Sequence, residues 1–293
     1  LAVANPADDL AFTDTDFSLV ESLAEQVGLA VHNCDAMQLQ IEKNKLDLDL
    51  ELACSIQNLL LPSQFPNSPK IEFAAQYTAA QKIGGDLYDV FAIDDNRIGV
   101  AIADVSGKGI SASILMAICQ TNLRHISRRK DSPAEVLSAI NVQMQSAMRR
   151  DMFITIIYAI IDQAEQSITF ARAGHELPLF YHRADDGSSQ IETIHSEGMA
   201  LGMVPPEMFD LMIKDQTMPF RKDDALILYT DGVTESVNAI GEEYSSERLI
   251  HALETHGDGS AQFILEQIMA SVHHFSGQAG QADDLTLVAI KHS

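Results

Sequence analysis

Apolar side chains recur every three or four positions from Asp16 to about Leu61, and this spacing predicts one long amphipathic helix that Asp16 can cap. Within it, the segment 45–52 alternates with a period of two, which is typical of a strand. Leu, Glu and Lys favour helix and no turn residue interrupts the segment, so the prediction stays helical. The heptad register is imperfect, and two interpretations remain open: a coiled-coil dimer, or a helix packed on its own domain.

Three prolines, Pro62, Pro66 and Pro69, mark the clearest boundary in the chain, because proline cannot continue a helix. They divide the sequence into residues 1–61 and residues 62–293. Beyond them we expect strands at 71–79, 87–93 and 97–105, helices at 109–130 and 132–150, strands at 153–162, 166–173, 177–182, 191–194, 208–217 and 225–230, helices at 246–254 and 260–275, and a strand at 285–291. Strands and helices alternate in blocks, which predicts an α+β fold with antiparallel sheets.

The chain is strongly acidic, with 42 Asp and Glu residues against 19 Lys and Arg residues and a formal net charge of −23. Such a surface repels phosphate backbones and anionic lipid headgroups, so nucleic acids and membranes are poor candidates for partners. The acidity either serves solubility or includes carboxylates that converge on cations. Composition alone does not separate these two explanations, whereas the positions of the carboxylates can.

Several features predict a cytoplasmic protein, or the cytoplasmic part of a longer one. The cysteines, Cys34, Cys54 and Cys119, form no CxxC pair and fall in predicted helices, which is typical of thiols in a reducing compartment. No apolar run approaches the roughly 20 residues of a membrane span. The first ten residues lack the basic and apolar regions of a signal peptide.

Acidic residues stand at predicted strand ends or tight turns, beside small residues, at Asp86, Asp104, Asp231 and the pair Asp283-Asp284. Strand ends are rigid places on which to mount metal ligands. Taken singly, each of these residues is better explained as a turn residue or a solvated charge than as a metal ligand. Asp104 is harder to explain in that way, because it follows an apolar run that predicts a buried strand. A carboxylate there needs a cation or several hydrogen bonds.

A rival interpretation starts from residues 107–112, which fit the pattern G-x-G-x-x-A between a predicted strand and a predicted helix. In a dinucleotide-binding fold, an acidic residue about 20 positions later would bind the ribose, and here that residue is Asp131. However, Asp131 falls in a helix-to-helix turn, and the next elements are not a parallel strand. We therefore favour the metal-binding interpretation over a nucleotide-dependent oxidoreductase.

Motifs in a recognisable order run through most of the chain: Ile56-Gln57 with Leu61-Pro62, GGDLYD at 84–89, DVSGKG at 104–109, AGH at 173–175, YTDGVTE at 229–235 and DDLT at 283–286. From about residue 53 to residue 292 the chain resembles the SpoIIE-like, or RsbU-like, branch of the PPM (type 2C) protein phosphatases. The resemblance implies a four-layer α-β-β-α sandwich of two antiparallel sheets flanked by helices, preceded here by the long N-terminal helix.

The same resemblance implies a pair of Mn²⁺ or Mg²⁺ ions at one end of the sandwich. By motif, Asp104 matches the ligand that bridges the two ions, and Val105 would contribute its backbone carbonyl. Asp231 and Asp283 match ligands of the second ion, and Asp86 matches a carboxylate that helps to hold the first. Two cations would activate a water molecule for attack on a phosphate ester, with Asp86, Asp104, Asp231 and Asp283 as the catalytic carboxylates.

Further candidates for the site are Asp89, Asp284, Gly107 and Lys108. Lys108 stands where relatives often have His, and we hypothesise that it attracts the substrate phosphate. The alternative is a solvated lysine at the start of a helix.

Three other positions bear on catalysis or depart from the family pattern. Ser106 occupies the place of a candidate general acid, His, in many type 2C enzymes. Arg172 replaces an Asn that usually precedes the AGH motif, and the sequence suggests no role for it. His175 is interpreted as a structural turn residue rather than a catalyst.

The resemblance points to a protein phosphoserine or phosphothreonine phosphatase that acts on a bacterial regulatory protein. It suggests a phosphorylated STAS-type anti-sigma factor antagonist in a partner-switching, stress-response pathway. The alternative is a catalytically weak, phosphatase-like binding module, although the complete set of carboxylates argues against a degenerate site. In addition, residues 17–33 resemble the closing helix of a GAF sensor domain, so the N-terminal helix is expected to link a sensor to the catalytic domain and possible homodimer contacts involve this helix.

Overall fold

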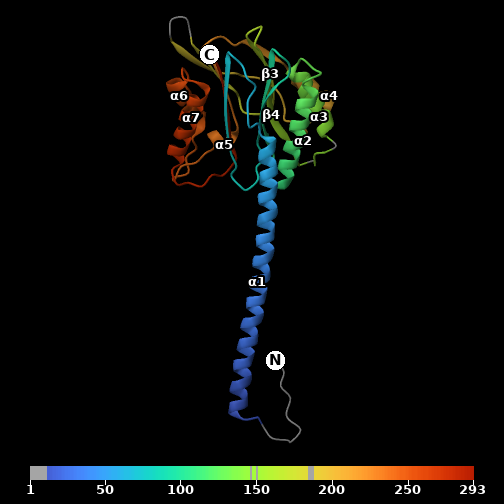
Figure 1. The fold of residues 1–293 in the computed structure, drawn as a ribbon, viewed down its shortest axis with the longest axis vertical. Helices are drawn as coiled ribbons and strands as arrows, with labels where there is room; N and C mark the ends of the chain where they lie inside the picture. The colour runs from blue at the N-terminus through green and yellow to red at the C-terminus, as the bar shows by residue number, and fades with distance from the viewer. Residues whose placement is uncertain (1–11, 146, 150, 184–187) are drawn as a thin grey trace. The chain divides into compact units, whose positions relative to one another are not determined.

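The structure is a computed structural model, and it describes residues 12–145, 147–149, 151–183 and 188–293. The predicted N-terminal helix is confirmed as α1 (Asp14–Leu60), the long helix at the start of the colour gradient in Figure 1. The chain divides into two compact units, Leu1–Leu52 and Ala53–Ser293. This division falls inside α1, so the domain boundary expected between residues 61 and 62 stays a prediction.

In the first unit, the described residues are the part of α1 that ends at Leu52 and the two residues before the helix, and the apolar side chains of this part are largely exposed. They recur along the helix, as the sequence pattern predicts. In the part of the chain that the structure describes, no helix is both long enough and apolar enough to cross a membrane.

The described residues of the second unit form two five-stranded sheets in which every neighbouring pair of strands is antiparallel. One sheet has the order β1 (Ile71–Thr78), β10 (Leu285–His292), β9 (Ala225–Tyr229), β6 (Leu179–Arg183) and β7 (Ser189–Thr193). The other has the order β2 (Leu87–Ala92), β3 (Arg97–Val105), β4 (Ile154–Asp162), β5 (Ser167–Ala173) and β8 (Gln216–Pro219).

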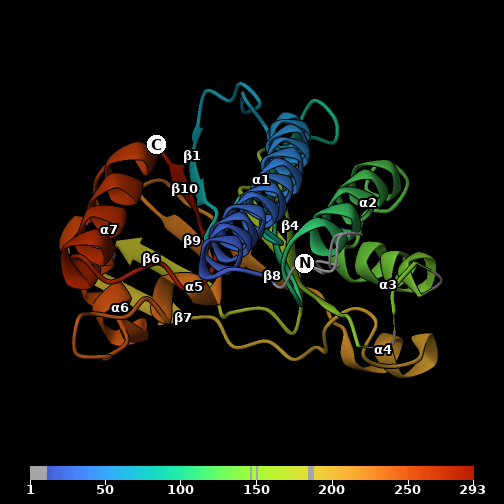
Figure 2. The ribbon, with the colours of Figure 1, turned by 90° about the horizontal axis from the view of Figure 1, so that it is seen from below.

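The two sheets pack face to face, and helices cover their outer faces (Figures 1 and 2). The β2–β8 sheet is covered by α2 (Ile110–Ile126) and α3 (Pro133–Met144), with α4 (Pro206–Met212) packed on α3. The β1–β7 sheet is covered by α6 (Ser245–His256) and α7 (Ala261–Ser276). The expected α-β-β-α sandwich is therefore confirmed.

Strand β3 shows why the sequence folds in this way. Its side chains alternate between two buried environments: Val100 and Ile102 face the core between the sheets, whereas Ala101 and Ala103 face α2 and α3. A strand that is buried on both faces reads as an uninterrupted apolar run. Small side chains on the outer face leave room for the helices to pack closely.

One expected strand is wrong in part. The sequence pattern predicts a strand over 208–217. In the structure this segment begins within α4, and β8 starts only at Gln216. Pro205 and Pro206 explain the difference, because proline is well tolerated at the start of a helix and its fixed φ favours helical geometry. The predicted helices 109–130 and 132–150 are also shorter, ending at Ile126 and Met144.

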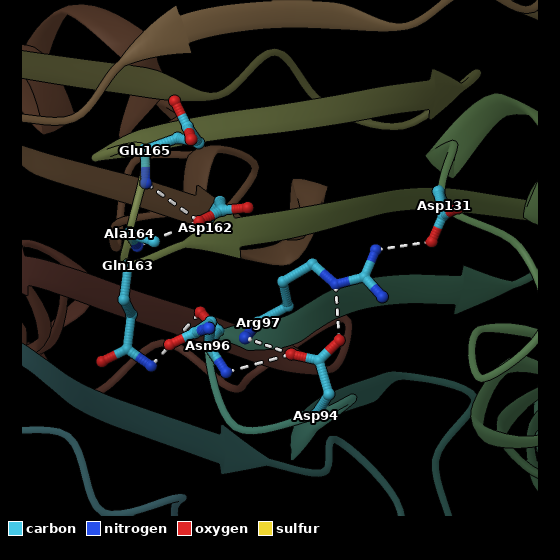
Figure 3. Close-up of polar contacts among 8 residues, drawn as sticks. All are labelled: Asp94, Asn96, Arg97, Asp131, Asp162, Gln163, Ala164 and Glu165. Atoms are coloured by element: carbon cyan, nitrogen blue, oxygen red, sulfur yellow. Dashed lines mark hydrogen bonds and ion pairs between the residues drawn. The ribbon is translucent and has the colours of Figure 1, made fainter.

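The strand topology contradicts the dinucleotide-binding interpretation. Strand β3, which precedes the glycine pattern, has antiparallel neighbours on both sides rather than the parallel neighbours of that fold. Asp131 is used elsewhere: Arg97, at the opposite end of β3, donates to Asp94 in the hairpin turn and to Asp131 in the connection between α2 and α3 (Figure 3). This ion-pair network ties the hairpin to the helical layer.

Candidate active site

Strand parity brings the predicted carboxylates to one end of the sandwich. In β3, Asp104 continues the alternation of Val100 and Ile102 and therefore falls on the inner face of its sheet. Asp86 precedes β2 by one residue and continues the alternation of Tyr88 and Val90, so it also falls on the inner face of the sheet. The β2 start pairs with the β3 end, so both carboxylates lie at the same edge.

The facing sheet contributes to the same end through β9 and β10. Thr230, just beyond β9, and Thr286, in β10, fall on the inner face by the same parity, since Leu228 and Val288 line the core. Asp231 opens α5 (Asp231–Thr234), a short helix that follows β9, and Asp283 lies two residues before the start of β10. The four predicted carboxylates thus come from four different strand ends.

Asp86 is held by the facing sheet. Its side chain is buried, and one of its oxygens, Oδ2, accepts hydrogen bonds from the hydroxyl of Thr230 at 2.8 Å and from that of Thr286. The backbone N–H of Thr286 donates in turn to the Thr230 hydroxyl, at 3.1 Å. Two hydroxyl donors on one oxygen leave Oδ1 as the oxygen of Asp86 that can meet a ligand.

The carboxylates are close enough to perturb one another. Burial raises the pKa of Asp104 to about 6, with further contributions from the negative charges of Asp231 and Asp283. Burial also raises the pKa of Asp86 well above its ordinary value, and the charge of Asp104 adds to the effect. The pKa of Asp231 rises through burial and the charge of Asp283. Crowded carboxylates of this kind are stabilised by a bound cation.

The donor chemistry fits hard divalent cations, which prefer carboxylate and carbonyl oxygens. Within the described residues, however, no group of three or more His, Cys, Asp or Glu side chains already stands in a metal-holding arrangement. The carbonyl oxygen of Val105 points toward Gly85, where a side-chain Cβ would lie 2.8 Å from it. The site therefore has the oxygen ligands for a cation, and their final geometry requires side chains to adjust around it.

Asp284 acts on the backbone of the GGD loop. Its two carboxylate oxygens accept from the N–H groups of Ala80, at 2.8 Å, and Gly85, at 2.7 Å. The approach is so close that a Cβ on Gly84 would collide with the Asp284 carboxylate. Asp284, a further candidate in the sequence, thus holds the loop that carries Asp86.

Gln57 holds the same loop from the other side. Its buried side-chain amide donates to the carbonyl of Gly84 at 2.8 Å. Gln57 belongs to the first of the family motifs, but the sequence does not predict its hydrogen bond to Gly84. The glycines of the loop are therefore fixed by hydrogen bonds from both sides.

Asp89 lies outside the cluster. It belongs to the outer face of β2, where it is fully buried and forms a bidentate ion pair with Arg124 of α2, at 2.6 and 2.7 Å. Gln120 of α2 donates to it as well, at 3.2 Å. Strand parity could have signalled this placement, because Asp86 and Asp89 are three residues apart and so face opposite sides of a strand.

Lys108 contacts the cluster at its rim. Its Nζ lies 3.1 Å from Oδ1 of Asp283 and donates to the carbonyl of Ala282 at 2.8 Å. Gly107, directly before it, has a φ of 91°, a left-handed conformation that favours glycine. The turn at Gly107 thus brings a basic side chain to an otherwise acidic site.

Ser106 and His175 each form a hydrogen bond within the protein. The Ser106 hydroxyl accepts from the backbone N–H of Phe153 at 2.8 Å. His175 is buried beside Thr155, and burial lowers the pKa of His175 to about 3. Its imidazole is therefore neutral near pH 7, and the structural role expected for it stays a prediction.

Comparison with known proteins gives a consistent result. Residues 94–293 match the family described as Stage II sporulation protein E (SpoIIE). Phosphoserine phosphatase RsbU of Bacillus subtilis (strain 168) is 29% identical over 251 residues, which cover 85% of this chain and 71% of RsbU. Phosphoserine phosphatase RsbP of the same organism is 29% identical over 247 residues, covering 83% of this chain but 57% of RsbP.

Solved structures share the fold. The SiaA-PP2C domain of Pseudomonas aeruginosa superposes with a TM-score of 0.70 at 18% identity, over 86% of this chain and 98% of that domain. RsbX, solved in complex with magnesium, superposes with a TM-score of 0.58 at 18% identity, over 78% of this chain and 99% of RsbX. Both comparisons match the sandwich described above.

Proposed function

This chain belongs to the SpoIIE family of PP2C-type protein phosphatases, and we propose that it hydrolyses phosphoserine or phosphothreonine on a partner protein with two bound Mn²⁺ or Mg²⁺ ions. The observation that carries the proposal is the convergence of Asp86, Asp104, Asp231 and Asp283 from separate strand ends, with pKa values raised at three of them. The names of RsbU and RsbP and the magnesium in RsbX support it.

The residues divide the work at the site. Asp104, Asp231 and Asp283 would hold the ions together with the Val105 carbonyl, and Asp86 would offer Oδ1. When bound, divalent cations supply a water of lowered pKa and neutralise charge on the phosphate oxygens. The protein keeps the ligands in register through the threonine hydroxyls on Asp86 and the grip of Asp284 on the GGD loop.

Lys108 is placed to favour an anionic substrate. Its ammonium group lies at the rim of the carboxylate cluster, where it offsets part of the negative charge that would repel a phosphate. We expect Lys108→Ala to raise KM several-fold with little change in kcat. Unchanged kcat and KM would reduce Lys108 to a surface lysine that pairs with Asp283.

The proposed substrate is a phosphorylated STAS-type anti-sigma factor antagonist, on the strength of the family resemblance. The test is to incubate the purified chain with a phosphorylated STAS domain and Mn²⁺ and to follow release of inorganic phosphate. We expect release to stop with excess chelator and in the Asp104→Asn variant. Calorimetric titration with Mn²⁺ should show binding to the wild-type protein and much weaker binding to the variant.

The catalytically weak binding module is the alternative outcome of this experiment. Stable capture of the phosphorylated STAS domain without phosphate release, at saturating Mn²⁺, would favour the module. Metal-dependent release from a generic aryl phosphate but not from the STAS domain would keep the phosphatase and reject the partner.

We also propose that α1 forms a homodimer. Val20, Val27, Cys34, Ile41 and Leu48 recur every seven residues along the helix, the spacing of one position in a coiled coil. Most of these side chains are exposed, so the stripe is available to a second copy. Paired helices would bury apolar surface that the first unit leaves in water.

A further inference from the structure

A groove opens beside the carboxylate cluster, between the loops 174–177 and 195–197. His175, which lines the groove, hydrogen-bonds the hydroxyl of Thr155, and Thr155 pairs with Asp104 across β4 and β3. The groove therefore lies beside the strand end that carries Asp104. Burial and the charge of Asp231 raise the pKa of Glu176, which also lines the groove.

Arg172 builds both walls of this groove. Its Nη1 donates to the carbonyl of His175 at 2.5 Å, on one loop. Its Nε and Nη2 donate to the carbonyl of Ser196, at 3.0 and 2.6 Å, on the other loop. The planar guanidinium donates from Nε and Nη2 to one carbonyl and from Nη1 to the other at the same time.

The backbone around Arg172 has little freedom. A Cβ on Gly198 would collide with the carbonyl oxygen of Arg172, and Gly198 has a φ of 147°. Gly174 has a φ of 71°, and a Cβ there would lie 2.7 Å from the backbone nitrogen of Ala200. Glycines at these close approaches keep the two loops in fixed positions beside each other.

Arg172 forms no ion pair among the residues that the structure describes, although the charge of Glu176, which also lines the groove, interacts with it. Its partners are neutral carbonyls and the Ser196 hydroxyl, and each terminal nitrogen has a second N–H beyond the hydrogen bond described. The side chain is half-buried and lines the groove. Arg172 thus offers a cation and N–H donors inside a chain whose net charge is −23.

We propose that this groove binds the polypeptide segment that flanks the phosphorylated residue of the substrate, and that Arg172 is the residue that positions it. The proposal rests on the phosphatase function proposed above and adds where the protein part of the substrate lies. An extended segment fits a site that ends at the reacting phosphate and presents N–H donors to backbone carbonyls.

A second cavity borders the cluster on the side of Asp283, and it fits this role less well. It is lined by Glu235 and Gln281, together with residues of α7. No Lys or Arg is among its lining residues, and Lys108 reaches only its rim, where it is already paired with Asp283 and Ala282. The cavity therefore lacks an N–H donor comparable to Arg172.

The experiment compares two substrates in the full chain with Mn²⁺. One is a mixture of nine-residue peptides with a central phosphoserine and random flanks, and the other is para-nitrophenyl phosphate, which has no flanks. The variants are Arg172→Asn, which removes the bridge, and Arg172→Lys, which keeps the charge without the planar fork. Arg221→Asn is the matched control, because Arg221 is exposed near the start of β9, at the opposite end of that strand from Asp231.

We expect Arg172→Asn to raise KM for the peptides about tenfold and to leave kcat and the turnover of para-nitrophenyl phosphate within about twofold, as loss of one binding contact implies. Arg172→Lys should fall between wild type and Arg172→Asn, and Arg221→Asn should match wild type. Circular dichroism and thermal unfolding establish that each variant is folded.

Two results overturn the groove assignment while leaving the phosphatase intact. One is an unchanged KM for the peptides in Arg172→Asn, and the other is an equal loss on both substrates, which would place Arg172 in the general support of the site. Absence of metal-dependent turnover of either substrate by the wild-type chain would overturn the proposed function and the groove together.

Discussion

Asp86 illustrates how one carboxylate is prepared for a ligand. The hydroxyls of Thr230 and Thr286 occupy Oδ2, so the position of Oδ1 depends on two residues of the facing sheet. Loss of a group that orients a metal ligand in this way typically lowers metal affinity by about 10- to 100-fold. Thr230 and Thr286 belong to two of the motifs whose aspartates are predicted metal ligands. Their hydrogen bonds to Asp86 are seen only in the structure.

We expect Thr286→Val to weaken Mn²⁺ binding by about tenfold, because the valine keeps the shape of the side chain but cannot donate to Asp86. Thr286→Ser keeps the hydroxyl and should bind Mn²⁺ nearly as well as wild type. Calorimetric titration measures both affinities without reference to turnover. Equal affinities for the valine and serine variants would show that this hydrogen bond does not orient Asp86.

At the scale of the elements, alternation along the strands explains most of what the sequence could predict. The apolar run before Asp104 predicts a buried strand, and the period of two places Asp104 on the inner face. The same count places Asp89 on the outer face, against Arg124 of α2. Asp89 lies three residues from Asp86 in the sequence, but the two side chains project from opposite faces of the sheet.

Contacts between segments that are far apart in the chain cannot be predicted from the sequence pattern. Nothing in the order of residues indicates that Asp284 grips the N–H of Gly85, almost two hundred positions away, or that Arg172 joins two loops. The apolar residues of α4 also fit a strand pattern, so periodicity alone predicts the wrong element there. The proline pair at its start is the sequence feature that indicates a helix. Such features depend on tertiary neighbours rather than on local periodicity.

Helix α1 allows a direct test of the proposed dimer. Cys34 is exposed and falls in the heptad stripe, so a parallel, in-register dimer would bring the two Cys34 side chains face to face. We expect a mild oxidant to convert most of the protein to a disulfide-linked dimer on a non-reducing gel, and Cys34→Ser to abolish the product. Cys54→Ser should leave it unchanged.

A failure to form the cross-link would not by itself separate an antiparallel dimer from a monomer, so the mass in solution is measured in parallel by light scattering. A monomer at the concentration of the cross-linking experiment would contradict the proposed dimer. A dimer without cross-link would retain the association and reject the parallel register.

For the whole molecule, the carboxylate cluster is a place where the fold stores unfavourable electrostatic energy. The chain already carries a net charge of −23, and its sandwich brings several aspartates to one end. Each buried charge that lacks a counter-ion opposes folding, whereas a bound cation reverses the sign of the interaction. Ligation and stability should therefore be linked through the same residues.

This linkage predicts how stability varies with pH in the presence of a chelator. The pKa of Asp104 is about 6 in the folded protein, against an ordinary value near 3.8, so the folded state holds a proton on this group more tightly than the unfolded chain does. Its contribution to the free energy of unfolding is therefore greatest below pH 4 and is lost as the pH rises to 6. The loss amounts to at most about 3 kcal/mol.

We expect Asp104→Asn to be more stable than wild type at pH 7.5 in chelator, and this advantage to shrink as the pH falls to 4.5, as measured by urea unfolding. Excess Mn²⁺ at pH 7.5 should reverse the order, since wild type gains the binding energy and the variant does not. The matched control is Asp95→Asn, in the exposed hairpin turn, which should follow wild type at each pH. A difference between Asp104→Asn and wild type that does not vary with pH would mean that the cluster is not under electrostatic strain, and the argument for a cation there would lose its energetic basis.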